Sequence, residues 1–377
     1  MAGQEKGRFL EPDYAEAFRC DGQRCGARCC RHWGIYVDEV TYGRYLALGQ
    51  EEREWVLSHI EEDPPAEEQA KGPLYRARLD FELTESCPFL REDELCSLQR
   101  RLGEGYLGDT CALYPRHIVR IGPYLERSLS LSCPVAAELA LLRKEMPRLV
   151  ERELPLERQA GWTVTACGPG EEGMAEAFLL LQLMSWHILS AHGLALPERL
   201  QLLLRALEEA DKAVEAGDFE ALQQVSDRYG QPRAGAAGQE ADWPLLPGEA
   251  LSSLQAVLAP AEGANQHTVG TEPMATACAL PPKEHLLENY VLAELYIGFY
   301  PCRLGGSLKH NGEVLYALAA LAEQAVAEAY ASGSAAGALA ACVRLSTLAN
   351  HDQDWLKALS GWAKENAGKF RIETKGA

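Results

Sequence analysis

Cysteine placement is the feature that most restricts what this 377-residue chain can fold into. Eight of the twelve cysteines fall within the first 133 residues, so one local structure must account for them. The other four are scattered among helical segments, where we expect small buried side chains. The eight clustered cysteines are Cys20, Cys25, Cys29, Cys30, Cys87, Cys96, Cys111 and Cys133, and the scattered ones are Cys167, Cys278, Cys302 and Cys342.

The surrounding sequence predicts a reducing compartment. Residues 1–18 are acidic and contain no apolar run, so no secretory signal is expected. The most apolar stretch, 177–196, is interrupted by Gln182, Ser185 and His187, which favours a buried core helix over membrane insertion. We therefore expect a cytoplasmic protein. A dense cysteine cluster there favours metal binding or catalysis over disulfides.

The formal charge of −19 argues against partners that require a basic surface. Nucleic acids and anionic membranes attract proteins mainly through lysine and arginine. The sequence has 36 of these residues against 55 aspartates and glutamates. We therefore expect no nucleic-acid partner.

Cysteine spacing separates the eight thiols into two groups. The run Cys20-x4-Cys25-x3-Cys29-Cys30 lets one loop present several thiolates to zinc or iron. Cys29 and Cys30 point in divergent directions, so either one binds while the other packs, or they serve different atoms. The remaining four must be gathered by tertiary folding, and His32 or His117 could replace one ligand. The set suits two four-thiolate zinc sites, or one iron–sulfur cluster with spare thiols.

Hydrophobic periodicity predicts a mainly α protein with a small mixed α+β, cysteine-rich portion at the front. Residues 75–83 and a hairpin over 117–133 are the strand candidates. Helical spacing marks 37–60, 134–146, 174–230 (two or three helices), 284–301, 313–333 and 337–351.

We expect four regions along the chain. Residues 1–140 would form a metal-cluster domain and 141–230 a helical domain. Residues 231–283 read as a linker or long loops, because the first part of this region is rich in glycine, alanine and proline. Residues 284–377 would form a C-terminal helical region packing on the rest.

Two cysteine-bearing segments resemble the cysteine-cluster family of zinc- or iron-chelating proteins. They are FRCDGQRCGARCCRHWGIYVDEVTYGRY and CPFLREDELCSLQRRLGEGYLGDTCALYPR. LSLSCPVAAELALL and HLLENYVLAELYIGFYP more specifically resemble flagellin lysine-N-methylases of the FliB type. This resemblance implies methyl transfer from S-adenosylmethionine to lysines of flagellin. It also implies a cysteine-bound iron–sulfur centre, expected as 4Fe-4S, with zinc as the alternative.

A Rossmann-type methyltransferase is not expected. Gly168-x-Gly170-x-x-Gly173 matches a dinucleotide fingerprint, and the preceding WTVTAC could be a strand. A Rossmann site needs a second strand ending in an acidic residue about 20 positions later. A long apolar helical stretch follows here instead.

The implied chemistry selects candidate site residues. Lysine has a reference pKa of about 10.4, so the site must desolvate it or accept its proton before it attacks the methyl carbon. Carboxylates and tyrosines suit this role, aromatic faces suit the sulfonium, and arginines suit the cofactor carboxylate. Tyr290 also fits a core aromatic, and the arginines also fit structural ion pairs. Tyr290, Tyr124 and Glu126 are the catalytic candidates, and Arg116, Arg127, Tyr114, Glu288 and Asn289 the cofactor-binding ones.

Two other functions compete with methyl transfer. A non-enzymatic metal-binding or chaperone-like module would use the helical region to hold a partner. A thiol-redox sensor would release metal on oxidation. Incubating the purified protein with flagellin and labelled S-adenosylmethionine distinguishes the binding module from an enzyme.

Overall fold

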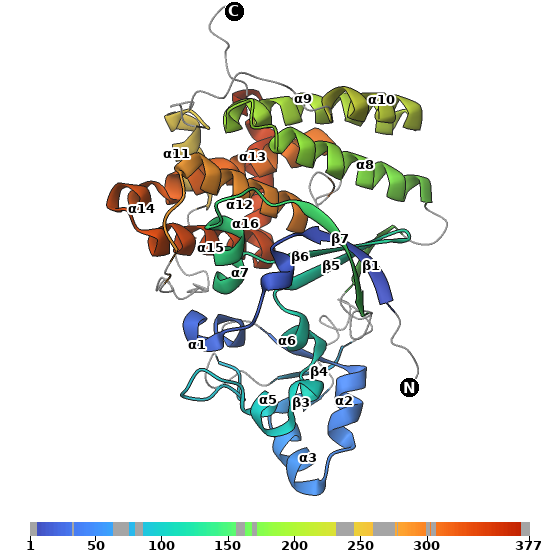
Figure 1. The fold of residues 1–377 in the computed structure, drawn as a ribbon, viewed down its shortest axis with the longest axis vertical. Coiled ribbons are helices and arrows are strands. Elements are labelled where there is room, and N and C mark those ends of the chain that lie inside the picture. Colours follow the sequence, from blue (N-terminus) through green and yellow to red (C-terminus); the bar gives the residue numbers. More distant parts are fainter. Residues whose placement is uncertain are drawn as a thin grey trace, which may run out of the picture.

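Helices make up most of the structure, as the sequence predicts (Figure 1). This computed structural model describes residues 6–31, 34–62, 75–79, 86–155, 163–167, 172–230, 245–258, 276, 278–298, 302 and 307–370. His32, Gly168 and Gly170 lie outside these residues, as does most of the predicted linker.

A five-stranded sheet lies against the helical body. Its order is β7 (Leu149–Pro155), β1 (Lys6–Pro12), β6 (Tyr124–Leu129), β5 (Arg116–Ile121) and β8 (Thr163–Cys167). β1 runs parallel to β6 and β5 runs parallel to β8, whereas the other neighbours are antiparallel. β6 is therefore the central strand, with paired neighbours on both sides.

The predicted hairpin is present as β5 and β6. Ile121 pairs with Tyr124, which leaves Gly122 and Pro123 as a two-residue loop. Gly122 has a φ of +58°, the positive value that such hairpin loops require and that glycine adopts at little cost. A side chain there would also lie 2.8 Å from the Cβ of Ala175, so the loop fits closely against the helical body.

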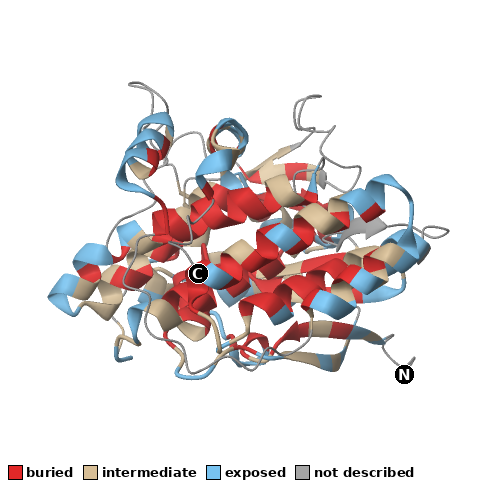
Figure 2. Cartoon of the chain, turned by 90° about the horizontal axis from the view of Figure 1, so that it is seen from above, coloured by how far each residue is buried: buried red, intermediate tan, exposed pale blue. Residues whose placement is uncertain are grey.

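The helical body is built around one deeply buried helix, α12 (Lys283–Ile297). Every residue from 286 to 297 is buried, because α12 contacts α7, α8, α13 and strand β6. Figure 2 shows that buried residues are concentrated in the helices at the middle of the molecule. The surrounding helices are α7 (Pro134–Leu141), α8 (Glu172–Leu189), α9 (Leu196–Glu215), α10 (Phe219–Tyr229), α11 (Gly248–Leu258), α13 (Leu308–Ala325), α14 (Ala327–Ser332), α15 (Ala335–His351) and α16 (Gln353–Glu365).

A smaller lobe has its own core at the opposite end of the molecule (Figure 1). Its three-stranded sheet has the order β2 (Tyr36–Asp38), β4 (Tyr75–Leu79), β3 (Ile60–Glu62). Its helices are α2 (Glu39–Leu46), α3 (Gln50–Leu57), α5 (Ser97–Leu102) and α6 (Asp109–Leu113), and α1 (Gly22–Cys25) lies between the lobe and α7. The helical spacing of 37–60 corresponds to two short helices between strands β2 and β3.

The large sheet draws strands from both sides of the predicted boundary at residue 140, because β7 and β8 follow it. α11 lies within the predicted linker. The four-region division stays a prediction. No helix among the described residues is long and apolar enough to cross a membrane.

Candidate functional site

Four of the predicted metal-binding cysteines gather beside the start of α7. We call Cys20, Cys25, Cys29 and Cys133 the α7 thiol group. Cys25 ends α1, which packs on α7, and Cys133 is the residue that precedes the first turn of α7. Burial raises the pKa of Cys133 to about 12, and the nearby Cys25 and Cys20 thiols contribute to the increase. Tyr114 lies beside this group, since Cys133, Cys29 and Cys25 all raise its pKa after burial does.

The other four cysteines gather in the small lobe. We call Cys30, Cys87, Cys96 and Cys111 the lobe thiol group. The Cys87 backbone N–H donates to the Cys30 carbonyl oxygen at 2.7 Å. The pKa of Cys111 is raised well above its usual value, first by desolvation and then by the Cys30, Cys87 and Cys96 thiols, although the residue itself is exposed at the surface. Cys29 and Cys30, adjacent in sequence, thus have mainly different neighbours.

Both thiol groups have the chemistry of a soft-metal site but are not closed around an ion. Among the residues that the structure describes, all these cysteines are free thiols, and no three Cys, His, Asp or Glu side chains are arranged to hold a metal. The thiols of Cys29 and Cys30 are hydrogen-bonded to each other, which raises the pKa of Cys29 and lowers that of Cys30. Metal binding would therefore require thiol side chains to turn toward a common point.

Glu126 is an isolated carboxyl group in the interior between the sheet and the helices. It lies on central strand β6 and is 2% exposed. No hydrogen bond of normal geometry reaches either of its carboxyl oxygens from the described residues, although the Gln182 side chain of α8 is near enough to lower its pKa. Burial dominates and raises the pKa of Glu126 to about 8. A carboxyl with this pKa is mostly protonated at pH 7, and its ionised fraction is a stronger base than an ordinary glutamate.

Tyr296 of α12 faces the same interior. Burial raises its pKa well above its usual value, and the nearby Glu126 and Glu11 carboxyls raise it further. Its hydroxyl donates to the Leu10 carbonyl oxygen at 2.8 Å, which joins α12 to β1. The sequence does not single out Tyr296, because α12 is buried on all sides and no polar face shows which of its residues point toward the sheet.

Glu11 has the opposite electrostatic environment from Glu126. It is fully buried on β1 and forms ion pairs with Arg127 at 2.5 Å and Arg152 at 3.0 Å. The sequence predicts that Arg127 holds a cofactor carboxylate, whereas in this structure its guanidinium forms an ion pair with Glu11. That role for Arg127 stays a prediction, and it would require a change of partner.

The remaining candidates do not converge on one point. Tyr290 is fully buried in the main core, and Tyr124 is 48% exposed at the hairpin turn. Asn289 donates to the Leu141 carbonyl oxygen at 3.4 Å, and Tyr114 shares a 3.0 Å hydrogen bond with Ser132. The Arg116 guanidinium lies 5.1 Å from the centre of the Phe18 ring, and Glu288 forms a buried pair with Arg199. These assignments stay predictions.

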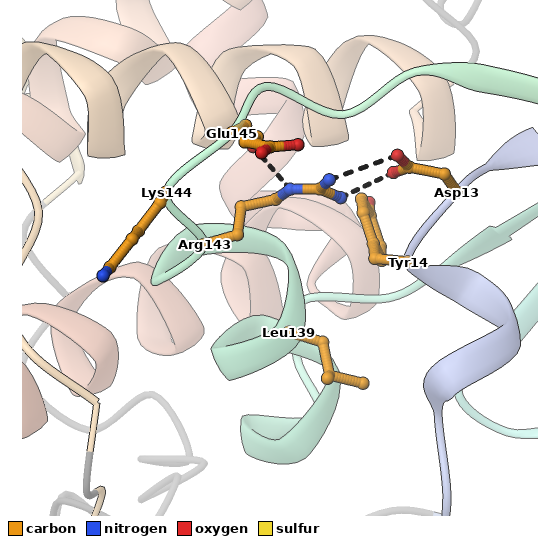
Figure 3. Close-up of a pocket in the computed structure, with 6 residues that line it drawn as sticks. All are labelled: Asp13, Tyr14, Leu139, Arg143, Lys144 and Glu145. Carbon is orange, nitrogen blue, oxygen red and sulfur yellow. Dashed lines mark hydrogen bonds and ion pairs between the residues drawn. The ribbon is translucent and has the colours of Figure 1, made fainter.

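A pocket of about 370 Å³ opens where the chain leaves β1 and where α7 ends (Figure 3). The Arg143 side chain lies across the pocket. Its Nη1 donates to Asp13 Oδ1 at 2.6 Å, and its guanidinium carbon lies 5.6 Å from the centre of the Tyr14 ring. Burial raises the pKa of Asp13, but the Arg143 hydrogen bond and charge outweigh this and leave it lowered. Leu139, Lys144 and Glu145 complete the lining.

Tyr14, which lines the pocket, lies near a buried carboxyl of α12. Glu294 of α12 is fully buried and contributes to the raised pKa of Tyr14, mainly a result of burial. Asn350 of α15 donates to Glu294 at 3.3 Å. One residue of the pocket wall, Tyr14, therefore lies near the buried helix α12. Sequence reasoning did not identify these residues, because they come from segments with unremarkable local patterns.

Part of the chain is similar to known proteins. A 145-residue stretch, 38% of the chain, is 30% identical to a protein of Salmonella typhimurium named Lysine-N-methylase and covers 35% of its length. The same identity and coverage hold for a Lysine-N-methylase of Salmonella choleraesuis. A 125-residue stretch, 33% of the chain, is 32% identical to the flagellar biosynthetic protein FliU of Salmonella muenchen and covers 71% of that protein.

The match spans only about a third of the two lysine-N-methylases. No family model and no solved structure matches the chain.

Proposed function

The chain belongs to the family of FliU and the lysine-N-methylases, and from that premise we propose that it methylates lysine side chains of flagellin with S-adenosylmethionine. The relatives' names supply the reaction and the flagellar context. We place the reaction in the cytoplasm, where thiols stay reduced. The observation in the fold that carries the proposal is the buried Glu126 carboxyl.

The reaction requires a neutral amine. The lysine nitrogen attacks the methyl carbon in line while the carbon–sulfur bond breaks and its electron pair stays on sulfur. A lysine enters protonated, with a reference pKa of about 10.4. In a water-poor site, an ammonium next to a carboxylate can lose its proton to it, because both groups then become neutral. Glu126, in its ionised form, is the group that would accept this proton.

Neighbouring side chains would direct that exchange. Gln182 lies beside the Glu126 carboxyl, and Tyr296 lies near both Glu126 and Glu11, whose carboxyls contribute to its raised pKa after burial does. Glu11 is already paired with Arg127 and Arg152. We take the pocket of about 370 Å³ beside Tyr14 as the entrance for the lysine.

A cysteine-bound centre, iron–sulfur of the 4Fe-4S kind or zinc, accompanies the proposal. Thiolates are ligands for both, and the two thiol groups supply eight of them. When bound, the centre would hold α1, the lobe and α7 together. Methyl displacement transfers no electron, so the centre has a structural role in this proposal.

The direct test is incubation of the purified full chain with flagellin and methyl-labelled S-adenosylmethionine, followed by mass spectrometry of flagellin lysines. We expect lysine methylation, reduced about 100-fold or more in Glu126→Gln if the carboxyl accepts the proton. Glu153→Gln, an exposed change on β7 of the same sheet, is the matched control and should leave the rate unchanged. No labelled lysine from protein with intact metal would favour the binding-module function instead.

A further inference from the structure

Four arginines lie on one face of the five-stranded sheet. Cross-strand partners share a face, and so do residues two positions apart along a strand. Arg120 of β5 pairs with Leu125 of β6. Leu125 pairs with Phe9 of β1, and Phe9 pairs with Arg152 of β7. Alternate positions of β5 and β6 add two more arginines to this side, which we call the arginine face. The four are Arg116, Arg120, Arg127 and Arg152.

The arginine face is turned away from helix α8. Val119 and Ile121, on the opposite face of β5, form a cluster with Ala175 of α8. The apolar cluster on the arginine face is instead made of strand residues, namely Phe9, Ile118, Leu125 and Leu154. Arginine stems suit such a cluster, because they cover apolar surface while the guanidinium keeps contact with water. Arg116 and Arg120 are accordingly half-buried.

Positive charge on the arginine face exceeds negative charge. Among the described strand residues, Glu11 is the one carboxylate that the register places there, and it pairs with two of the four arginines. Arg152 has a second partner, Glu16, at 2.7 Å. Arg116 and Arg120 form no ion pair with any residue that the structure describes. Two guanidinium groups therefore remain without a carboxylate.

Arg116 lies where positive charges are crowded together. Burial lowers its pKa, and the charges of Arg127 and Arg19 lower it further. Glu104 of the lobe and Cys20 act in the opposite direction without reversing the shift. Three guanidinium groups thus lie close enough to repel one another, and a carboxylate placed among them would relieve that repulsion.

The spacing of the arginines suits an extended chain and not a single small anion. Arg116 and Arg120 are four residues apart on β5, which is about 13 Å along the strand. Arg127 is opposite Ile118, so it lies diagonally from both, with about 7–8 Å between Cα atoms. Side chains on one face of an extended peptide recur about every 7 Å. Glutamates at alternate positions of such a peptide match successive arginines.

We propose that the arginine face docks an extended, acidic segment of the protein substrate, with Arg116 and Arg120 binding its carboxylates. That the segment belongs to the substrate rests on the proposed function, whereas docking itself needs no methyl transfer. The formal charge of −19 makes most of the chain repel such a segment, so the arginine face determines where it lies. Stable nucleic-acid binding takes more cationic contacts than this face offers.

Fluorescence anisotropy tests the docking with a labelled peptide that has glutamate at alternate positions. The peptide is mixed with the purified full chain without S-adenosylmethionine. Arg120→Gln should weaken binding about fivefold, and Arg116→Gln/Arg120→Gln about tenfold or more. Arg205→Gln removes the same charge at an exposed position of α9 and should bind as the unchanged chain does.

Two further measurements use the unchanged chain and do not depend on how the variants fold. Its affinity for the peptide should fall as salt rises, and a peptide with glutamine in place of glutamate should not bind. Equal binding of the two peptides, or equal affinity of the unchanged chain and the double variant, would overturn the proposal. So would a single-stranded oligonucleotide that binds more tightly than the glutamate peptide.

Flagellin kinetics then test whether the docked segment belongs to the substrate. Arg120→Gln should raise KM for flagellin several-fold and leave kcat unchanged, because a docking contact acts equally in the ground state and the transition state. An unchanged KM would overturn the assignment of the segment to the substrate. Absence of methylation by the unchanged chain would contradict the proposed function, and the peptide measurement would still decide the docking.

Discussion

At the scale of single residues, Glu126 should make stability depend on pH in a direction unusual for a carboxyl. Its pKa of about 8 in the folded protein exceeds the ordinary 4.5, so the folded state keeps a proton that the unfolded state releases. Its stabilising contribution is complete below pH 4.5 and is lost as pH rises through 8. Glu126→Gln mimics the protonated acid and lacks this loss.

Urea unfolding of the two proteins at several pH values measures the effect. We expect the difference in unfolding free energy to be small near pH 5 and to grow by a few kcal/mol in favour of Glu126→Gln by pH 8. Comparing the two proteins cancels the titration of all other groups. Parallel stability curves across this pH range would show that Glu126 ionises normally.

The hairpin residue Gly122 should tolerate no side chain. Gly122→Ala places a Cβ at a φ of +58° and 2.8 Å from the Cβ of Ala175. Both effects destabilise the fold, together by about 1–3 kcal/mol. Gly173→Ala near the start of α8 is the control, because no atom lies within 4 Å of its added Cβ. Thermal unfolding should show a lower Tm for the first variant only; equal values would contradict the close fit of the loop.

At the scale of elements, one buried ion pair joins α9 to α12. Arg199 pairs with Glu288 and also donates to the carbonyl oxygens of Leu189 and Leu194, which connect α8 to α9. Arg199→Met should cost about 3–5 kcal/mol, because it leaves Glu288 charged and buried without its partner. Denaturant unfolding measures the loss.

The double variant Arg199→Met/Glu288→Met supplies the control for that prediction. It removes both charges and should recover much of the lost stability, since apolar replacement of a complete buried pair is often nearly neutral. A double variant as unstable as the single one would mean that the arginine acts through its two backbone carbonyl bonds and not through the charge of Glu288.

Local sequence patterns predict some elements and miss others for a physical reason. The hairpin over 117–133 and the helices of 174–230 follow from short-range alternation and apolar spacing, so the sequence shows them. The pairing of β1 with β6 and β7 joins residues more than a hundred positions apart. No local pattern encodes this long-range pairing, although the pairing is what buries Glu126 and Glu11. The candidate proton acceptor was therefore named from its residue type, whereas its raised pKa required the fold.

At the scale of the whole molecule, two separate cores predict two units of unequal stability. The lobe core is small, whereas the main core extends through α7, the end of the central strand β6 and the helices around α12. Phe89 is almost fully buried in the lobe, with its ring 5.4 Å from that of Trp55. Phe89→Ala should cost about 3–5 kcal/mol by leaving a cavity. That cost should fall on the lobe.

Hydrogen exchange followed by mass spectrometry reveals where the protection is lost. In Phe89→Ala, amides of α2, α3 and α5 should exchange faster, while amides of α12 and α13 keep their protection, because the lobe opens as a unit of lower stability. Leu292→Ala, in the middle of α12, is the counterpart in the main core and should weaken protection throughout the helical body. Equal loss of protection in both regions of Phe89→Ala would mean that the lobe and the body unfold together, with the thiol groups at their boundary coupling them into one cooperative unit.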